Sequence, residues 1–212
     1  MRLQVVEELR HLSPPFDVAH GFEVRRDDYE YDLWFAGRRS GLGDYADIRR
    51  VDSINDPETA AMIREYKPDL VIVFGTSRLA EAVIAAADTV LNLHGGDPEQ
   101  YRGLDSHLWA IYHRDFDNLL TCLHVVNRDL DDGAIVSIRP VALARGMKLH
   151  QLRASNTETA WRLSHDAIRE FAETGRVMSR PQRMRGRYYS FMPSVLKAQC
   201  ERRFDAYCEN LP

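Results

Sequence analysis

The chain has 212 residues, 44% of them hydrophobic, and carries 28 lysines and arginines against 32 aspartates and glutamates. This length suits one α/β domain with a small appendage better than two full domains. A formal net charge of −4 offers no electrostatic footprint for wrapping a nucleic-acid backbone, so no nucleic-acid partner is expected. No apolar run approaches the length of a membrane span and no signal-peptide core is evident, so no membrane association is expected.

The cysteines favour a reducing compartment. There are three, which is not an even set for disulfides. Cys122 lies inside an apolar, strand-like run, and Cys200 and Cys208 fall on one side of a C-terminal helical segment, where burial is the favoured role. We therefore predict a cytoplasmic protein.

The N-terminal quarter has the weakest patterns. Residues 3–12 place Leu3, Val6, Leu9 and Leu12 at helical spacing, although the start of this run could equally be a short strand. Residues 22–35 show no clean period, and residues 37–43 are typical of a loop. Asp56 and Pro57 then predict a helix that runs to about Tyr66, because an aspartate N-cap accepts amide hydrogens and proline suits the first helical position.

A parallel crossover follows. Residues 70–74 are almost all apolar and mostly β-branched, which predicts a strand buried on both faces. A turn at residues 75–79, a helical segment at 80–87 and a second strand at 89–93 complete a strand-helix-strand unit. Both strands of such a unit end at the same rim of the sheet, so we expect Gly75–Leu79 to lie close to Asn92–His94.

The rest of the chain predicts a mixed sheet and further helices. A helix at 106–113 precedes strands at 119–126 and 134–138, which must be antiparallel because only a tight acidic turn joins them. Ser155 and Glu158 predict a capping box for a helix to about Thr174 that Gly175 ends, with Trp161, Leu163, Ala167, Ile168 and Phe171 as its apolar contacts. Residues 193–207 predict a last helix.

Two polar side chains stand at the end of the second strand. Asn92 and His94 are two apart, so they share a face, and a carboxylate of the 127–133 turn could join them. An amide, an imidazole and a carboxylate suit attack on a carbonyl, since they can stabilise an oxyanion, move a proton and orient the base. The alternative is structural: Asn92 satisfies loop backbone, His94 packs beneath the glycines and Asp131 closes a turn. His94, His107, His113 and His124 lack ligand spacing, so no metal site is predicted.

Several motifs together resemble the formyltransferases that use 10-formyltetrahydrofolate, over a stretch from about Lys67 to Arg139. The family includes the glycinamide ribonucleotide, methionyl-tRNA and sugar N-formyltransferases. The motifs are Asn92-Leu93-His94, Tyr101-Arg102-Gly103, Trp109-Ala110-Ile111 and Leu130-Asp131-Asp132-Gly133-Ala134-Ile135-Val136. The resemblance implies an α/β, Rossmann-like core with a mixed, mainly parallel sheet over residues 1–150, followed by a helical extension over residues 151–212.

The resemblance also implies site residues. Asn92 would hold the developing oxyanion, His94 would transfer the proton, and Asp131 would assist His94. The folate co-substrate would bind Gly75, Thr76, Ser77, Arg78 and Leu79 on one side, and Asn127 and Leu130 on the other. The alternative for Arg78 is an ordinary residue at the start of a helix. The acceptor would contact Gly95, Gly96, Tyr101 and Arg102.

Two departures from the family pattern bear on the acceptor. The usual His-Pro-Ser-Leu-Leu-Pro stretch is replaced by His94-Gly95-Gly96-Asp97-Pro98, which implies a more flexible loop over the acceptor. The opening strand and glycine-rich anion cradle are not visible near Met1, which argues against glycinamide ribonucleotide. The chain could also begin inside a longer family sequence and lack that strand.

The remaining residues favour a small acceptor. Family members that act on tRNA carry a further barrel domain, whereas only about sixty residues follow the core here, with no basic excess. We therefore expect a primary amine on a small molecule, first of all a nucleotide-linked amino sugar; glycinamide ribonucleotide or another small amine, a folate-binding protein without activity and a folate-dependent hydrolase are the alternatives. Tyr188, Tyr189 and Phe191 could stack on a base or sugar, or pack the C-terminal helices on the core. Amphipathic C-terminal helices could pair two subunits into a homodimer.

Overall fold

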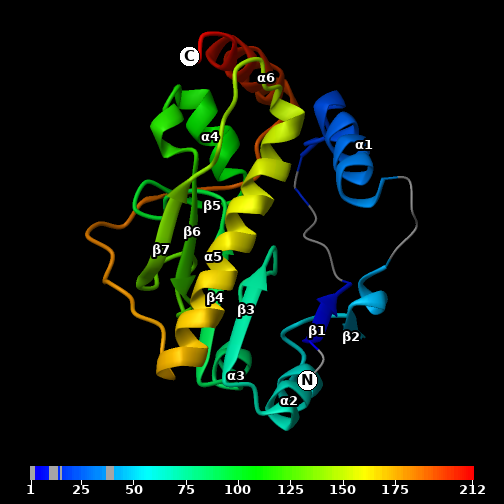
Figure 1. The fold of residues 1–212 in the computed structure, drawn as a ribbon, viewed down its shortest axis with the longest axis vertical. Coiled ribbons are helices and arrows are strands. Elements are labelled where there is room, and N and C mark those ends of the chain that lie inside the picture. Colours follow the sequence, from blue (N-terminus) through cyan, green and yellow to red (C-terminus); the bar gives the residue numbers. More distant parts are fainter. Residues whose placement is uncertain (1–2, 10–13, 15, 37–40) are drawn as a thin grey trace.

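The structure is a computed structural model that describes residues 3–9, 14, 16–36 and 41–212 (Figure 1). Its strands are β1 (Leu3–Glu8), β2 (Ala46–Val51), β3 (Leu70–Phe74), β4 (Thr89–His94), β5 (Tyr101–Gly103), β6 (Leu120–Val125), β7 (Ile135–Pro140) and β8 (Arg187–Tyr189). Its α-helices are α1 (Gly21–Phe35), α2 (Pro57–Tyr66), α3 (Glu81–Ile84), α4 (Ser106–His113), α5 (Leu152–Thr174) and α6 (Ser194–Glu209).

The central sheet has four strands in the order β3-β4-β6-β7. The β3–β4 pair is parallel, whereas β4–β6 and β6–β7 are antiparallel. The pairs β1–β2 and β5–β8 are both parallel. The predicted mixed α/β fold is therefore confirmed. Among the described strands parallel pairs outnumber antiparallel ones, although within the central sheet the reverse holds because β6 is antiparallel to both of its neighbours.

The crossover prediction is confirmed by the β3–β4 register, in which Val73 is paired with Asn92. This register brings the 75–79 loop to the rim where β4 ends. Two details were wrong. The helix between the strands covers only Glu81–Ile84, because the chain must turn back to enter β4 at Thr89. Strand β3 is only partly buried and Phe74 is 56% exposed, because β3 lies at the edge of the described central sheet.

Helix α5 covers one face of the central sheet and crosses it diagonally in Figure 1. Its Leu163 and Ala167 pack with Leu91 of β4 and Leu123 of β6 in one buried cluster. Gly175 ends the helix in a left-handed conformation (φ 73°), as predicted from its position. The predicted contacts of Trp161 and Ile168 were wrong, since these side chains are 65% and 51% exposed.

The predicted capping box at Ser155 was also wrong. A 3₁₀ turn at Leu149–Gln151 continues directly into α5, which therefore begins three residues earlier at Leu152. Ser155 lies inside the helix, where its hydroxyl donates to the carbonyl of Ala142. The Ser155 and Glu158 pattern therefore does not mark the start of the helix, because the preceding 3₁₀ turn continues directly into it.

A second buried cluster packs α4 against α6, which is the last helix predicted from the sequence. Cys200 and Cys208 are fully buried in it, together with Ile111 and Phe204. Cys122 is buried in β6, and all three thiols are free. Among the described residues, no helix is both long and apolar enough to cross a membrane.

The structure decides between a strand and a helix at the start of the N-terminal quarter. Residues 3–8 form strand β1, which pairs with β2 in a two-stranded sheet, so the strand alternative holds there; Leu12 and residues 37–40 lie outside the described residues. Residues 21–35 are helical despite their lack of period. The predicted helix α2 is confirmed, but the Asp56 side chain makes no capping bond, because its own carbonyl takes the amide hydrogens of Thr59 and Ala60 instead.

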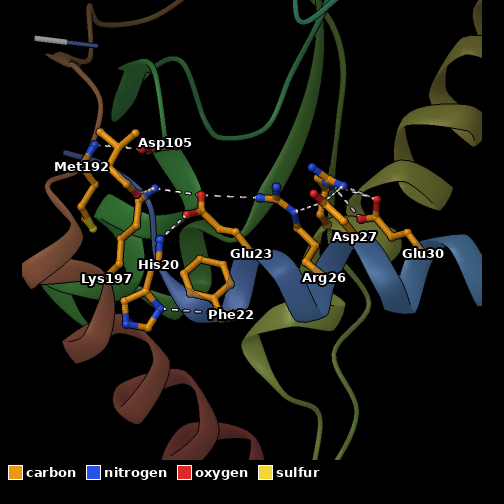
Figure 2. Close-up of polar contacts among 11 residues, drawn as sticks. His20, Phe22, Glu23, Arg26, Asp27, Glu30, Asp105, Met192 and Lys197 are labelled. Carbon is orange, nitrogen blue, oxygen red and sulfur yellow. Dashed lines mark hydrogen bonds and ion pairs between the residues drawn. The ribbon is translucent and has the colours of Figure 1, made fainter. Parts of the chain in front are cut away.

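Helix α1 is held by its ends and its charges rather than by an apolar stripe. A capping box at His20 begins it, with the imidazole accepting from the Phe22 amide and Glu23 accepting from the His20 amide. Lys197 of α6 is 2% exposed and donates to Glu23 Oε1 at 2.9 Å (Figure 2). Arg153 of α5 pairs with Asp27 and Glu30 of α1. These ion pairs place α1 against α5 and α6.

Candidate active site

A pocket of about 440 Å³ opens where β3 and β4 end. Its size lies in the usual range of small-molecule sites. One wall comes from the 75–79 loop and the acidic turn, and the opposite wall from Phe22, Glu23 and Arg26 of α1 with Leu152, Arg153 and Asn156 of α5. The predicted folate-binding residues all line it, namely Gly75, Thr76, Ser77, Arg78, Leu79, Asn127 and Leu130. Residues beyond position 150 therefore help to form the pocket.

The three predicted catalytic residues meet in this pocket. Asn92 and His94 lie on the same face of β4, and Asp131 reaches them from the turn between β6 and β7. Asn92 Nδ2 donates to Asp131 Oδ1 at 3.3 Å. His94 Nδ1 lies 3.6 Å from Asp131 Oδ2. This separation is too long for a hydrogen bond but short enough for an ion pair once the imidazole is protonated.

The backbone fixes the tautomer of His94. Its Nε2 lies 2.7 Å from the carbonyl oxygen of Tyr101, which can only accept a hydrogen bond, so the ring proton is on Nε2. The unprotonated Nδ1 then faces Asp131. Burial lowers the pKa of His94, although the Asp131 charge and the Tyr101 carbonyl oppose the shift. His94 is therefore a neutral base at pH 7, ready to accept one proton.

Asp131 is held as a carboxylate in a strained turn. Its φ is 51°, which is uncommon for a residue other than glycine. Burial raises the pKa of Asp131, but contacts with His124, His94 and the Gly103 amide outweigh burial and lower it. The Gly103 amide donates to Oδ2 at 2.8 Å. Gly133 closes the turn so tightly that a Cβ there would lie 1.7 Å from the Val125 carbonyl oxygen.

His124 joins this group and was not singled out from the sequence. It lies on β6 directly opposite Asn92 and is buried. Its Nδ1 donates to the Val125 carbonyl at 2.9 Å, so Nε2 accepts from Asn92 Nδ2 at 3.1 Å. It therefore orients the Asn92 amide. The available signal was a lone imidazole in an otherwise apolar strand. Over the described part of the chain, no group of three His, Cys, Asp or Glu side chains could hold a metal ion.

The residues predicted to contact the acceptor separate into two groups. Gly95 lines the pocket, whereas Gly96, Tyr101 and Arg102 do not. A Cβ at Gly96 would lie 2.8 Å from the Ser106 Cβ, so this glycine permits close packing. The Tyr101 hydroxyl donates to Asp115, and Arg102 Nε donates to the Leu130 carbonyl at 2.9 Å. In the structure these side chains support the wall of the site.

Arg78 bridges the two loops on the predicted folate side. Its Nε donates to the Arg128 carbonyl at 2.9 Å. It does not begin a helix, because α3 starts three residues later at Glu81. Arg78 therefore ties the 75–79 loop to the acidic turn.

The C-terminal aromatic residues mainly pack. Tyr189 stacks on Tyr101 and Trp109, with ring centroids 5.5 and 5.1 Å apart. Tyr188, Tyr189 and Phe191 are all absent from the pocket wall. The packing alternative describes the contacts of Tyr189, whereas Tyr188 is 54% exposed.

A strand-end pocket with a buried amide, a neutral imidazole and a carboxylate defines a class of α/β site suited to acyl transfer. Residues 24–168 match the formyl transferase family, which is more than half of the chain. The chain therefore belongs to the formyl transferase family.

Individual relatives are distant. The chain is 32% identical over 98 residues to a methionyl-tRNA formyltransferase from Chlorobium chlorochromatii, covering 46% of this chain and 31% of that protein. It thus spans about a third of the length of the curated relatives it matches.

Solved structures show the same fold at low identity. The formyltransferase PseJ from Anoxybacillus kamchatkensis, in complex with UDP-4,6-dideoxy-4-formamido-L-AltNAc and tetrahydrofolate, is 16% identical, with a TM-score of 0.56 over 90% of this chain and 86% of that chain. HypX from Aquifex aeolicus, in complex with tetrahydrofolic acid, is 18% identical, with a TM-score of 0.57 over 100% of this chain and 35% of that chain.

Proposed function

We propose that this protein transfers a formyl group from 10-formyltetrahydrofolate to a primary amine of a small acceptor, most readily a nucleotide-linked amino sugar. The observation that carries the proposal is the meeting of Asn92, His94 and Asp131 at one pocket wall, with the proton of His94 fixed on Nε2. The family membership supports the same chemistry.

Each side chain has a role in this reaction. Asn92 Nδ2 gives up its long bond to Asp131 Oδ1 and donates that hydrogen to the formyl oxygen as the oxygen gains negative charge, while the amine nitrogen bonds to the formyl carbon. His94 Nδ1 accepts a proton from the amine and passes it to the folate nitrogen as the bond from that nitrogen to the formyl carbon breaks. Asp131 stabilises the imidazolium between these two steps, because its carboxylate lies 3.6 Å away.

The residues of the pocket fit a folate. Apolar side chains suited to a flat aromatic ring line it, namely Val73, Leu79, Leu104, Val126 and Leu130. Two loop backbones, at 75–79 and 127–131, lie beside them and offer polar groups to the ring edge. The pterin would bind between these loops, with its formyl group directed at Asn92.

A nucleotide sugar is supported by one structural neighbour and by the charge balance. PseJ was solved with a UDP-linked formamido sugar, although at 16% identity the likeness is one of fold. The net charge of −4 does not favour a tRNA acceptor. Because the three buried thiols are free, we propose that the protein acts in the cytoplasm.

The test is a direct assay. Protein, 10-formyltetrahydrofolate and a panel of amines that includes UDP- and dTDP-linked amino sugars would be mixed, and tetrahydrofolate release followed by absorbance. Formylation of at least one amine, lost in His94→Ala, supports the proposal. Folate binding with no amine formylated indicates a binding protein, and formate release without an amine indicates a hydrolase.

A further inference from the structure

Beside His94, Gly95 leaves an open space in the pocket wall. A Cβ built on Gly95 would lie 3.4 Å from His107 Cε1, 3.6 Å from Asn156 Nδ2 and 3.7 Å from His107 Nδ1. These are ordinary van der Waals distances, so a side chain would fit, and its absence leaves room for one small group. All three residues line the pocket that holds the catalytic side chains.

Asn156 directs a hydrogen-bond donor into this space. The residue is 6% exposed, and its Oδ1 accepts from the Thr121 hydroxyl at 2.6 Å. The amide oxygen takes this bond in the structure, and Nδ2 is the atom turned toward Gly95. Within the described ranges Nδ2 makes no hydrogen bond, and it lies at the pocket wall, where a bound group can accept from it.

His107 directs an acceptor into the same space. Its Nε2 lies 2.6 Å from the Leu120 carbonyl oxygen and must donate to it. The opposite nitrogen, Nδ1, is then unprotonated. Burial lowers the pKa of His107 to about 4, so the ring is neutral at pH 7. In the part of the chain that the structure describes, Nδ1 has no hydrogen-bond partner.

We propose that Gly95, His107 and Asn156 form a subsite for a hydroxyl group adjacent to the reacting amine of the acceptor. One hydroxyl satisfies both unpaired atoms, because it donates its hydrogen to His107 Nδ1 and accepts from Asn156 Nδ2. The inference rests on the proposed function and narrows its substrate class to amines with a neighbouring hydroxyl, as in an amino sugar.

The chemistry of the subsite excludes other groups. A phosphate or carboxylate oxygen would face the lone pair of His107 Nδ1 and would have no hydrogen to donate. An ammonium group could donate to Nδ1 but would oppose the Asn156 donor. A neutral hydroxyl both donates and accepts. Gly95 and His94 line the same pocket, so the subsite lies within the space that would hold the reacting amine.

The subsite is tested by binding, which does not require turnover. A UDP-linked 4-amino-4,6-dideoxyhexose with a free 3-hydroxyl and its 3-deoxy analogue would be titrated calorimetrically into protein saturated with tetrahydrofolate. The wild type should bind the hydroxylated amine about tenfold more tightly, since two hydrogen bonds at the pocket wall are at stake. Equal binding of the two amines, or binding of neither, would overturn the inference.

Gly95→Ala is the sharpest variant, because its methyl group occupies the proposed hydroxyl position while leaving both polar side chains in place. It should bind the hydroxylated amine about as weakly as the deoxy analogue and keep its affinity for tetrahydrofolate. Gly41→Ala is the matched control, since a Cβ there meets nothing within 4 Å. If Gly95→Ala weakens both amines equally, the subsite is not where we place it.

A second variant covers the case in which Gly95→Ala does not fold. His107→Phe keeps the ring but removes the acceptor, and should reduce the preference for the hydroxylated amine. An unchanged preference would overturn the inference. Formylation of both amines without discrimination would contradict the subsite alone, whereas discrimination in binding without any formylation would contradict the proposed function alone.

Discussion

The two walls of the pocket are built in different ways. On the β4 side, Asn92, His94 and Asp131 are positioned by strand register, by backbone carbonyls and by a turn that admits only glycine at position 133. On the α1 side, charged side chains pair with one another, and the helix is attached through the buried Lys197 (Figure 2). Arg153 attaches it to α5. On the β4 side, burial and hydrogen bonds fix the protonation states of the catalytic side chains. On the α1 side, the ion pairs fix only the position of the helix.

The comparison predicts the largest effect at His94. His94→Ala should lower the rate of formyl transfer by about 10³-fold or more, because general acid-base catalysis at one group is worth roughly 10² to 10⁴. Tetrahydrofolate binding should persist, because the two loops that we propose to bind the folate, at 75–79 and 127–131, are untouched. Stopped assays with the best acceptor measure the loss, and His165→Ala on the exposed face of α5 is the control. Near-normal turnover in the variant would remove His94 from the mechanism.

The next largest effect is expected at the acidic turn. Gly133→Ala would drive a methyl group into the Val125 carbonyl, so either the turn or β6 must move. We expect a loss of about 3 kcal/mol or more in unfolding free energy, within the range of severe backbone clashes. Urea unfolding followed by circular dichroism measures it, with Gly41→Ala as the matched substitution. A stable and active variant would show that the turn is looser than described.

The buried imidazoles predict that the stability of the protein depends on pH. His107 has a pKa of about 4 when folded, below its unfolded value of about 6.5. The unfolded state therefore binds more protons between these values, so stability is constant above pH 6.5 and falls as the pH drops toward 4. Between pH 7 and pH 5 this amounts to about 2 kcal/mol.

Urea unfolding at several pH values checks this dependence. The variant His107→Phe should show a smaller loss on acidification than the wild type, because it no longer carries the group that protonates only on unfolding. His94 has a lowered pKa for the same reason and contributes in the same direction. Equal slopes in the variant and the wild type would mean that His107 is not held neutral.

The smallest effects are expected on the α1 side. Glu23→Gln leaves the buried Lys197 ammonium without its charged partner and should cost about 1 to 2 kcal/mol, since Glu23 itself is partly solvated. Arg153→Ala removes exposed ion pairs and should cost less than about 1 kcal/mol. Thermal unfolding ranks the two. A larger effect at Arg153 would show that α1 is held mainly by its contacts with α5 rather than by those with α6.

Prediction from the sequence succeeded where the signal was local. The apolar runs of β3, β4 and β6, the Pro57 start of α2 and the Gly175 end of α5 follow from patterns within a few residues. Prediction failed where the local structure depends on contacts with residues far along the chain. The lack of period in residues 21–35 concealed a helix, because α1 is held by Lys197 and Arg153 rather than by an apolar face.

The candidate site divides in the same way. The sequence by itself determined that Asn92 and His94 share a face, because strand side chains alternate, and the family pattern added Asp131. Only the tertiary structure decided that His124 meets Asn92 across the sheet and that Asn156, from a helix 61 positions beyond Gly95, completes a space beside it. Strand register and helix packing are long-range contacts, and no local pattern encodes which side chains they bring together.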